Sequence, residues 1–164
     1  MNALVSSWQT FFSAEVGASA ALTGLVMVAA SVNLSRILAH ELLPGRAAET
    51  VVALGGALVL SSLMLLPGQP AVAQGIECGL VGALSLAAPF TFQLHAHRSS
   101  FPNSEGRPIV RALLSSLVGV PLLIAGGLLF VGAAQGLYWA AAGIILSLVV
   151  GIIGAWVLLV EINR

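Results

Sequence analysis

One carboxylate lies inside a long apolar stretch of the chain, where its charge is costly. Glu77 belongs to residues 69–90, QPAVAQGIECGLVGALSLAAPF, which contain no other charged residue. A charge at the centre of a bilayer costs at least ~2.5–3.5 kcal/mol on insertion scales, and such residues commonly mark ion paths or proton relays. Two interpretations follow. Either Glu77 binds an ion or a proton, or it is protonated or hydrogen-bonded across a helix interface.

Glu15 is a second carboxylate of this kind, near the start of the first apolar segment. If both segments are helical, each glutamate shares one side of its helix with neutral polar residues. The two glutamates can then face each other or one wet cavity, and a shallower Glu15 can also reach headgroup water. The candidates for ion binding or a polar path are Glu77, Glu15, Gln74, Ser19, Thr23, Asn33 and Ser85.

Small residues lie on the side of these helices opposite the polar residues, and they recur on the last apolar segment. Ridges of small residues let helix backbones approach closely, which favours packing where lipid offers no hydrophobic driving force. We therefore expect tight packing within the chain and self-association between chains. The glycines predicted to pack are Gly17, Gly24, Gly75, Gly79, Gly143 and Gly151.

Other kinds of chemistry find little support. His95 and His97 with His40 could contribute to a metal site, but no Asp, second Cys or further His completes a ligand set. Cys78 has no histidine expected on its side of the membrane, no G-x-S-x-G motif occurs, and the chain contains no lysine for a phosphate-binding loop. The sequence thus predicts no catalytic residue, metal or cofactor, and a protein that is not an enzyme.

The elements that position these residues must be membrane helices. The chain has 164 residues, 59% hydrophobic and 7% charged, whereas soluble domains carry about 25% charged residues. Its net charge of zero argues against a nucleic-acid partner. A helix needs roughly 20 residues to cross a bilayer. We predict an all-α, single-domain polytopic membrane protein over 1–164, with spans at about 12–34, 49–66, 71–94, 109–133 and 138–161.

The arginines predict the orientation of this five-span arrangement. All six lie in the first loop, around the third loop or at the end of the chain, on one side of the membrane in such a model. The positive-inside rule then places the N-terminus outside and the C-terminus in the cytoplasm. Trp8, Tyr138 and Trp139 are expected in an outer aromatic belt, and Pro67-Gly68-Gln69-Pro70 in a tight turn between the second and third spans.

Three stretches together resemble a known family: AEVGASAALTGLVMVAASVNLSRIL at 14–38, LPGRAAETVVALGGALVLSSLMLLPGQ at 43–69, and GIECGLVG at 75–82. The family consists of small, uncharacterised bacterial integral membrane proteins, some of them labelled modulator of FtsH protease. The resemblance covers about the first half of the chain. It implies a multi-pass protein of the bacterial inner membrane and assigns no functional residue.

Two hypotheses about function follow from these features. The first is a homo-oligomeric channel or transport-type protein for a small cation or proton, in which Glu77 binds the ion and Glu15 guides its entry. The alternative is a non-enzymatic membrane regulator or assembly subunit, whose polar helix sides bind a larger membrane protein complex.

Overall fold

The protein folds as a bundle of long helices. The computed structural model describes residues 2–39, 43–97 and 107–162, and the side chains of residues 8–39, 43–87 and 113–157. Within these residues every regular element is an α-helix, which confirms the predicted all-α fold. The helices are α1 (Asn2–Val32), α2 (Leu34–Ala39), α3 (Leu43–Leu63), α4 (Ala71–His97), α5 (Arg107–Phe130) and α6 (Gly136–Ile162).

Four helical segments are long and apolar enough to cross a membrane. They are Trp8–Val32, Leu43–Leu63, Leu113–Phe130 and Gly136–Val157, and Ala71–Ala87 is a shorter apolar helix among the described side chains. Both α1 and α3 begin earlier than the predicted spans. Helix α3 can include Pro44 because this proline lies in its first turn. The N–H groups of a first turn have no acceptor within the helix, so proline, which has no N–H, loses no hydrogen bond there.

Several residues used to predict orientation and metal binding lie outside the described side chains. They are Arg98, Arg107, Arg111 and Arg164, together with His40, His95 and His97.

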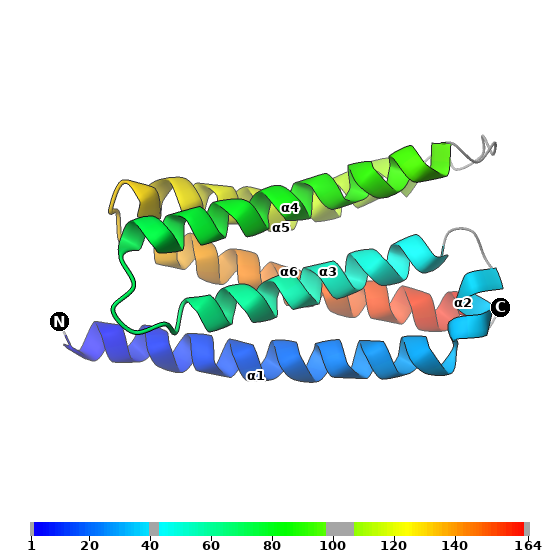
Figure 1. Ribbon diagram of the computed structural model, residues 1–164, viewed down its shortest axis with the longest axis horizontal. Helices are drawn as coiled ribbons and strands as arrows, with labels where there is room; N and C mark the ends of the chain where they lie inside the picture. Colours follow the sequence, from blue (N-terminus) through cyan, green and yellow to red (C-terminus); the bar gives the residue numbers. More distant parts are fainter. Residues whose placement is uncertain (1, 40–42, 98–106, 163–164) are drawn as a thin grey trace.

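Two tight turns close the same end of the bundle, where the N-terminus also lies (Figure 1). The first follows α3, and there Gly68 adopts a left-handed φ of 70° directly after Pro67, at the predicted position of the turn. The second follows α5. Gly132 has a φ of 78°, and the N–H groups of Gly132 and Ala133 donate to the carbonyls of Leu129 and Leu128, the Schellman pattern of a helix end. The short helix α2 lies at the opposite end.

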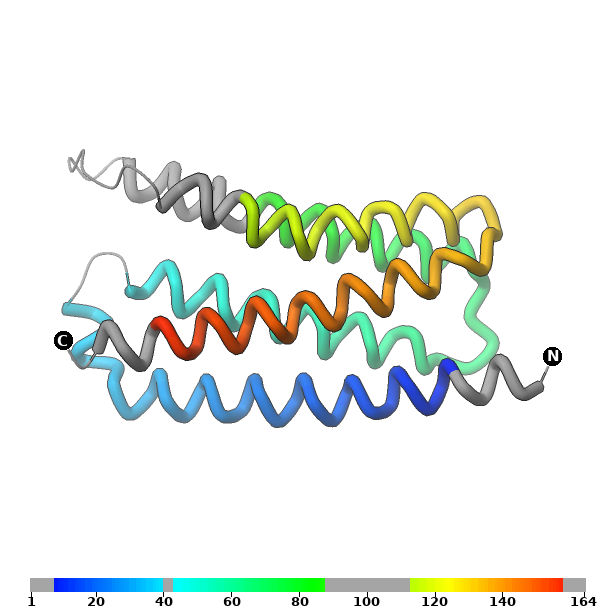
Figure 2. The backbone as a smooth tube through the Cα atoms, turned by 180° about the vertical axis from the view of Figure 1, so that it is seen from behind, coloured from blue at the N-terminus to red at the C-terminus, as the bar shows by residue number. Residues whose placement is uncertain are grey.

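Helix α6 forms the centre of the packing. It lies against α5 on one side and α3 on the other, and α1 packs mainly on α3. Figure 2 shows α6 from behind, running between α1 and the α4–α5 pair. Glycines on α6 provide recesses for leucines of both neighbours: a Cβ built on Gly143 would collide with Leu122 of α5, and one built on Gly151 with Leu54 of α3. Both leucines are among the most buried side chains of the core.

Glycine also determines how α4 meets α5, the most extensive helix pair in the structure. A Cβ on Gly75 would lie 2.6 Å from the backbone nitrogen of Phe130 and 2.8 Å from the carbonyl oxygen of Gly126. A Cβ on Gly82 would likewise lie 3.0 Å from the carbonyl oxygen of Gly119. The two backbones are therefore in direct contact from Gly75 to Gly82 of α4.

The small residues of α1 behave differently from the prediction of packing within the chain. A Cβ built on Gly17 or on Gly24 would have no atom of the described residues within 4 Å, and both glycines are exposed. The packed side of α1 carries Phe12, Ser19 and Val26 instead. The glycine side of α1 faces outward because the larger side chains on its other face fill the space against α3.

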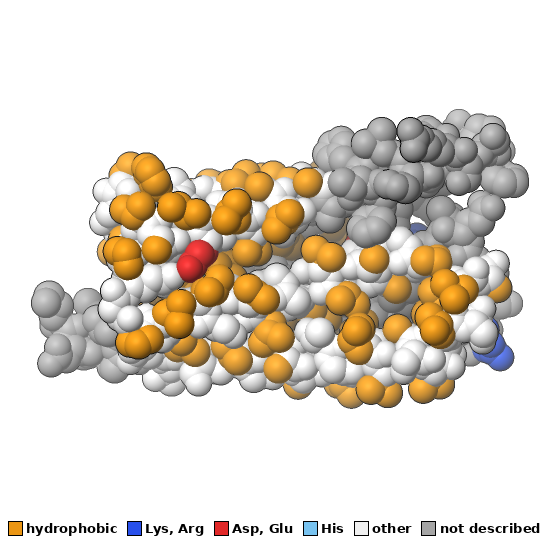
Figure 3. All heavy atoms as spheres, in the orientation of Figure 1, with side chains coloured by type: hydrophobic (Ala, Val, Ile, Leu, Met, Phe, Trp, Pro, Cys, Tyr) orange, Lys and Arg blue, Asp and Glu red, His pale blue; other side chains and the backbone are white. Residues whose placement is uncertain are grey.

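The outside of the bundle is apolar, as expected for contact with lipid. Exposed leucines, valines and isoleucines occur on all the long helices, while the core contains Leu54, Leu60, Leu122, Leu129, Ile144 and the single cysteine, Cys78. Figure 3 shows hydrophobic side chains across the described face, acidic atoms near the end with the α3–α4 turn, and basic atoms near the end with α2.

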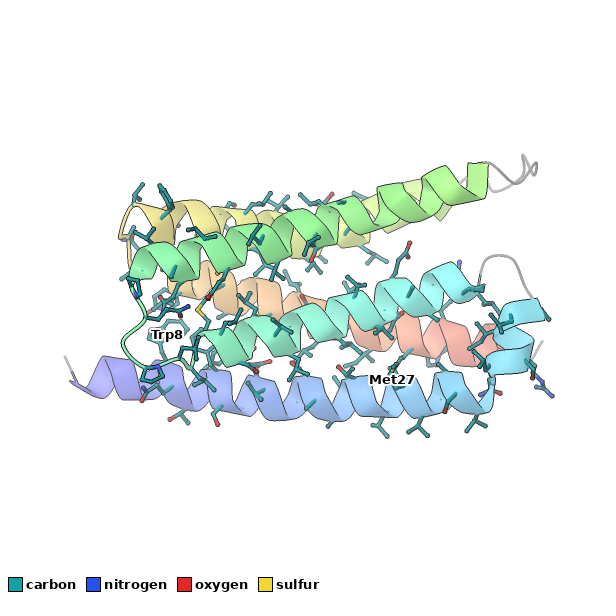
Figure 4. The ribbon with its side chains drawn as sticks, in the orientation of Figure 1. Trp8 and Met27 are labelled. Carbon is teal, nitrogen blue, oxygen red and sulfur yellow. The ribbon has the colours of Figure 1, made fainter. Side chains whose placement is uncertain are left out.

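An aromatic cluster marks the turn end of the bundle. The ring of Trp8 lies 4.9 Å from that of Tyr138, edge to face, and also contacts Phe11 and Phe12. Figure 4 shows Trp8 at this end, close to the α3–α4 turn. Tryptophan and tyrosine are enriched where a bilayer meets water.

Candidate functional site

Glu77 is held by a residue of the α3–α4 turn. It lies two helical turns into α4, and Nε2 of Gln69 donates a hydrogen bond to its Oε1 over 2.5 Å. Gln69 stands between Pro67-Gly68 and Pro70, so the turn that the prolines and glycine impose also folds its side chain back along the start of α4. The amide thus orients the carboxylate at the end of the bundle.

The same pair keeps two oxygen atoms without a partner. Oε2 of Glu77 and Oε1 of Gln69 are both buried and have no hydrogen-bond partner among the described residues. A carboxylate oxygen and an amide carbonyl oxygen are hydrogen-bond acceptors, and they are hard ligands for small cations. Because unpaired buried acceptors are costly, this pair calls for a proton, a water molecule or a cation.

The polar side of α1 faces the bundle. Ser19 is fully buried, Oε2 of Glu15 is buried, and the hydroxyl of Thr23 donates to the carbonyl oxygen of Ser19 over 2.7 Å. Neither the hydroxyl of Ser19 nor Oε2 of Glu15 has a hydrogen-bond partner among the described residues. Helix α3 adds Ser61, which is fully buried and whose hydroxyl also has no such partner.

These unpaired atoms share one half of the bundle. Ser61 belongs to the last turn of α3, Gln69 to the α3–α4 turn, and Glu77 to the first turns of α4. On α1, Glu15 lies just before the middle of the helix and Ser19 at its middle. All these segments lie between the turn end and the middle of the bundle (Figure 1). We call the five residues the polar layer.

The half toward α2 has a different interior. Ile37 and Leu43 form an apolar cluster with Ala30 and Ala47. Thr50, a buried polar residue of this half, donates its hydroxyl to the carbonyl oxygen of Arg46 four residues earlier. Arg46 and Glu49 of α3 each also bury one polar side-chain atom in this half, so charged groups occur there beside the apolar cluster.

The structure separates several of the residues that the sequence grouped. Helix α1 packs against α3 and α6, whereas α4 packs against α5 and α3, so Glu15 and Glu77 stand on helices that are not principal neighbours. Ser85 donates its hydroxyl to the carbonyl oxygen of Val81, and the amide of Asn33 donates to that of Ala29 at the end of α1. Gln74 is partly buried, one turn before Glu77.

Two members of the polar layer were missed by sequence reasoning. Gln69 carried a signal, because it is a polar residue held between two prolines immediately before the helix of Glu77. Ser61 carried a weaker one: it lies four and seven residues after the core positions Ala57 and Leu54, on the same helix face. Adjacent Ser62 is exposed and donates to the carbonyl oxygen of Leu58.

Comparison with known proteins adds no relative to this description: no protein-family model, curated protein or solved structure matches the chain.

Proposed function

We propose that the protein is a homo-oligomeric channel or transport-type membrane protein that binds a small cation or a proton at Glu77. Glu77 supplies the charge, and Gln69 orients its carboxylate. Glu15, on α1, receives the ion from the outer surface, and Ser19, Thr23 and Gln74 offer neutral oxygen atoms around the path.

The observation that carries this proposal is the state of the Glu77–Gln69 pair. One carboxylate oxygen accepts the amide N–H, while the other and the amide oxygen are buried without a partner among the described residues. Ionisable residues within membrane segments commonly serve ion or proton pathways. The hydroxyls of Ser19 and Ser61 in the same half of the bundle support a hydrated layer, because buried polar groups without protein partners are commonly bonded to water.

The proposal includes an orientation of the helices in the membrane. Helix α4 has 27 residues, and counting it as a fifth span puts the N-terminus outside and the C-terminus in the cytoplasm of a bacterial inner membrane. The polar layer then opens outward, while Arg36 and Arg46 face the cytoplasm. We assign the contact between chains to the exposed face of α1 with Gly17 and Gly24, and the path runs along this contact.

Ion flux into proteoliposomes tests this function. Wild-type vesicles loaded with a pH-sensitive dye, or with a sodium-sensitive one, are expected to take up protons or Na⁺ faster than empty vesicles, and Glu77→Gln is expected to reduce the rate at least about tenfold. Glu49→Gln, a carboxylate change near the other end of α3, is the matched control and should retain the flux. If Glu77→Gln conducts like the wild type, or if the wild type does not conduct, the proposal is wrong.

The alternative function is a non-enzymatic regulator or assembly subunit for a larger membrane complex. It is favoured by the apolar cluster of Ile37 and Leu43 in the α2 half, since a subunit that conducts nothing needs no continuous polar path. It predicts no flux in vesicles and co-purification with a larger complex, which Glu77→Leu should disrupt.

A further inference from the structure

An apolar groove of about 290 Å³ runs between α1 and α6 in the half of the bundle toward α2. Its wall comes from four helices and contains no polar side chain among its lining residues. These include Val26 and Ala29 of α1, Ile37 of α2, Leu54 of α3, and Ala155 and Trp156 of α6. The groove exists because small residues face each other across it and cannot fill the space between the two helices. Figure 2 shows α1 and α6 along this side.

The groove opens to the outer surface of the bundle, between buried residues such as Leu54 and exposed ones such as Leu25. Both α1 and α6 are candidate membrane spans, and Trp156 is 65% exposed at its edge. Empty apolar cavities do not hold water, so hydrocarbon is the medium that can fill this one. An acyl chain is already in an apolar environment, however, so the groove alone selects no lipid.

Selectivity can come from a charge on α2, the helix at one end of the groove. Arg36 is exposed on α2 and directly precedes Ile37, which lines the groove. Figure 3 shows basic atoms at this end of the bundle. A guanidinium matches phosphate geometry with two parallel N–H donors, and basic sites beside membrane helices bind anionic headgroups.

We propose that this groove is a binding site for an anionic phospholipid, with one acyl chain along α1 and α6 and the headgroup phosphate bound by Arg36. The site is at the end of the bundle opposite Glu77 and does not depend on ion transport. Trp156 lies against the bound chain and reports its presence.

Quenching of Trp156 by brominated lipids tests the proposal. The variant Trp8→Phe/Trp139→Phe leaves Trp156 as the only tryptophan of the three in the chain. It is reconstituted into phosphatidylcholine vesicles with increasing amounts of phosphatidylglycerol or phosphatidylcholine carrying brominated acyl chains. We expect half-maximal quenching at about fivefold less brominated phosphatidylglycerol, roughly the contribution of one arginine near an anionic surface. If this variant unfolds, the difference between the wild type and Trp156→Phe gives the same signal.

Three substitutions separate the headgroup from the groove. Arg36→Gln should abolish the preference for phosphatidylglycerol, and Arg36→Lys should retain part of it. Ala29→Phe should fill the groove and reduce quenching by both lipids, whereas Ala83→Phe, at an exposed position of α4 outside the groove, should not. Equal quenching by the two lipids in the parent variant, or a preference that survives Arg36→Gln, would overturn the proposal.

Discussion

Gly126 of α5 lies against Gly75 of α4 so closely that a Cβ built on Gly126 would be 2.9 Å from the carbonyl oxygen of Gly75. The same Cβ would be 2.9 Å from the backbone nitrogen of Gly79. Two backbones in such contact gain van der Waals energy along the whole crossing, which is the main attraction between helices in a membrane. The position of α4, and with it that of Glu77, therefore depends on these glycines.

A single methyl group at this crossing should be destabilising. We expect Gly126→Ala to lower the free energy of unfolding by about 1–3 kcal/mol, because the backbone of α4 must move to admit it. The adjacent Gly127 is the matched control: a Cβ there would have no atom of the described residues within 4 Å, so Gly127→Ala should be neutral or stabilising. Unfolding of both variants in mixed micelles measures the difference, and equal effects would contradict the close backbone contact.

The hydrogen bond between Gln69 and Glu77 should appear as a coupling energy. In a double-mutant cycle of Gln69→Ala and Glu77→Ala, we expect a coupling of about 1 kcal/mol, within the range measured for hydrogen bonds inside membrane proteins. The same cycle with Ser85→Ala in place of Gln69→Ala is the control, because the hydroxyl of Ser85 bonds to Val81 two turns further along α4, and its effects should add. A coupling near zero for the Gln69 cycle would mean that the turn does not hold the carboxylate.

The open face of α1 leads to a prediction about assembly, which rests on the proposed function. Native mass spectrometry of protein released from lipid nanodiscs should show a homo-oligomer for the wild type. Gly17→Leu/Gly24→Leu should shift it toward the monomer, since a Cβ on either glycine meets no atom of the part of the chain that the structure describes. Ala83→Leu, on the exposed side of α4, should leave the oligomer intact. A monomeric wild type would contradict the proposed path between chains.

Local chemistry explains which features were predictable. Hydrophobic segments of this length indicate membrane helices whatever their neighbours, and Pro67-Gly68 restricts the backbone to a turn without help from distant residues. Helical periodicity likewise indicated that Glu15 and Ser19 share one side of α1, and the structure turns that side inward.

The tertiary structure decided which of these sides meet. Periodicity assigns a residue to a helix face but does not identify the neighbouring helix, so Gly75, Gly143 and Gly151 pack tightly while Gly17 and Gly24, in a similar sequence pattern, face outward. For the same reason Glu77 meets Gln69 of the preceding turn, and Glu15 lies on a helix beside α3 and α6. The sequence by itself determined a helical membrane protein with carboxylates in its apolar segments. The order in which the helices pack decided which residues lie beside each carboxylate. That order depends on the fit of side chains that are distant in the sequence.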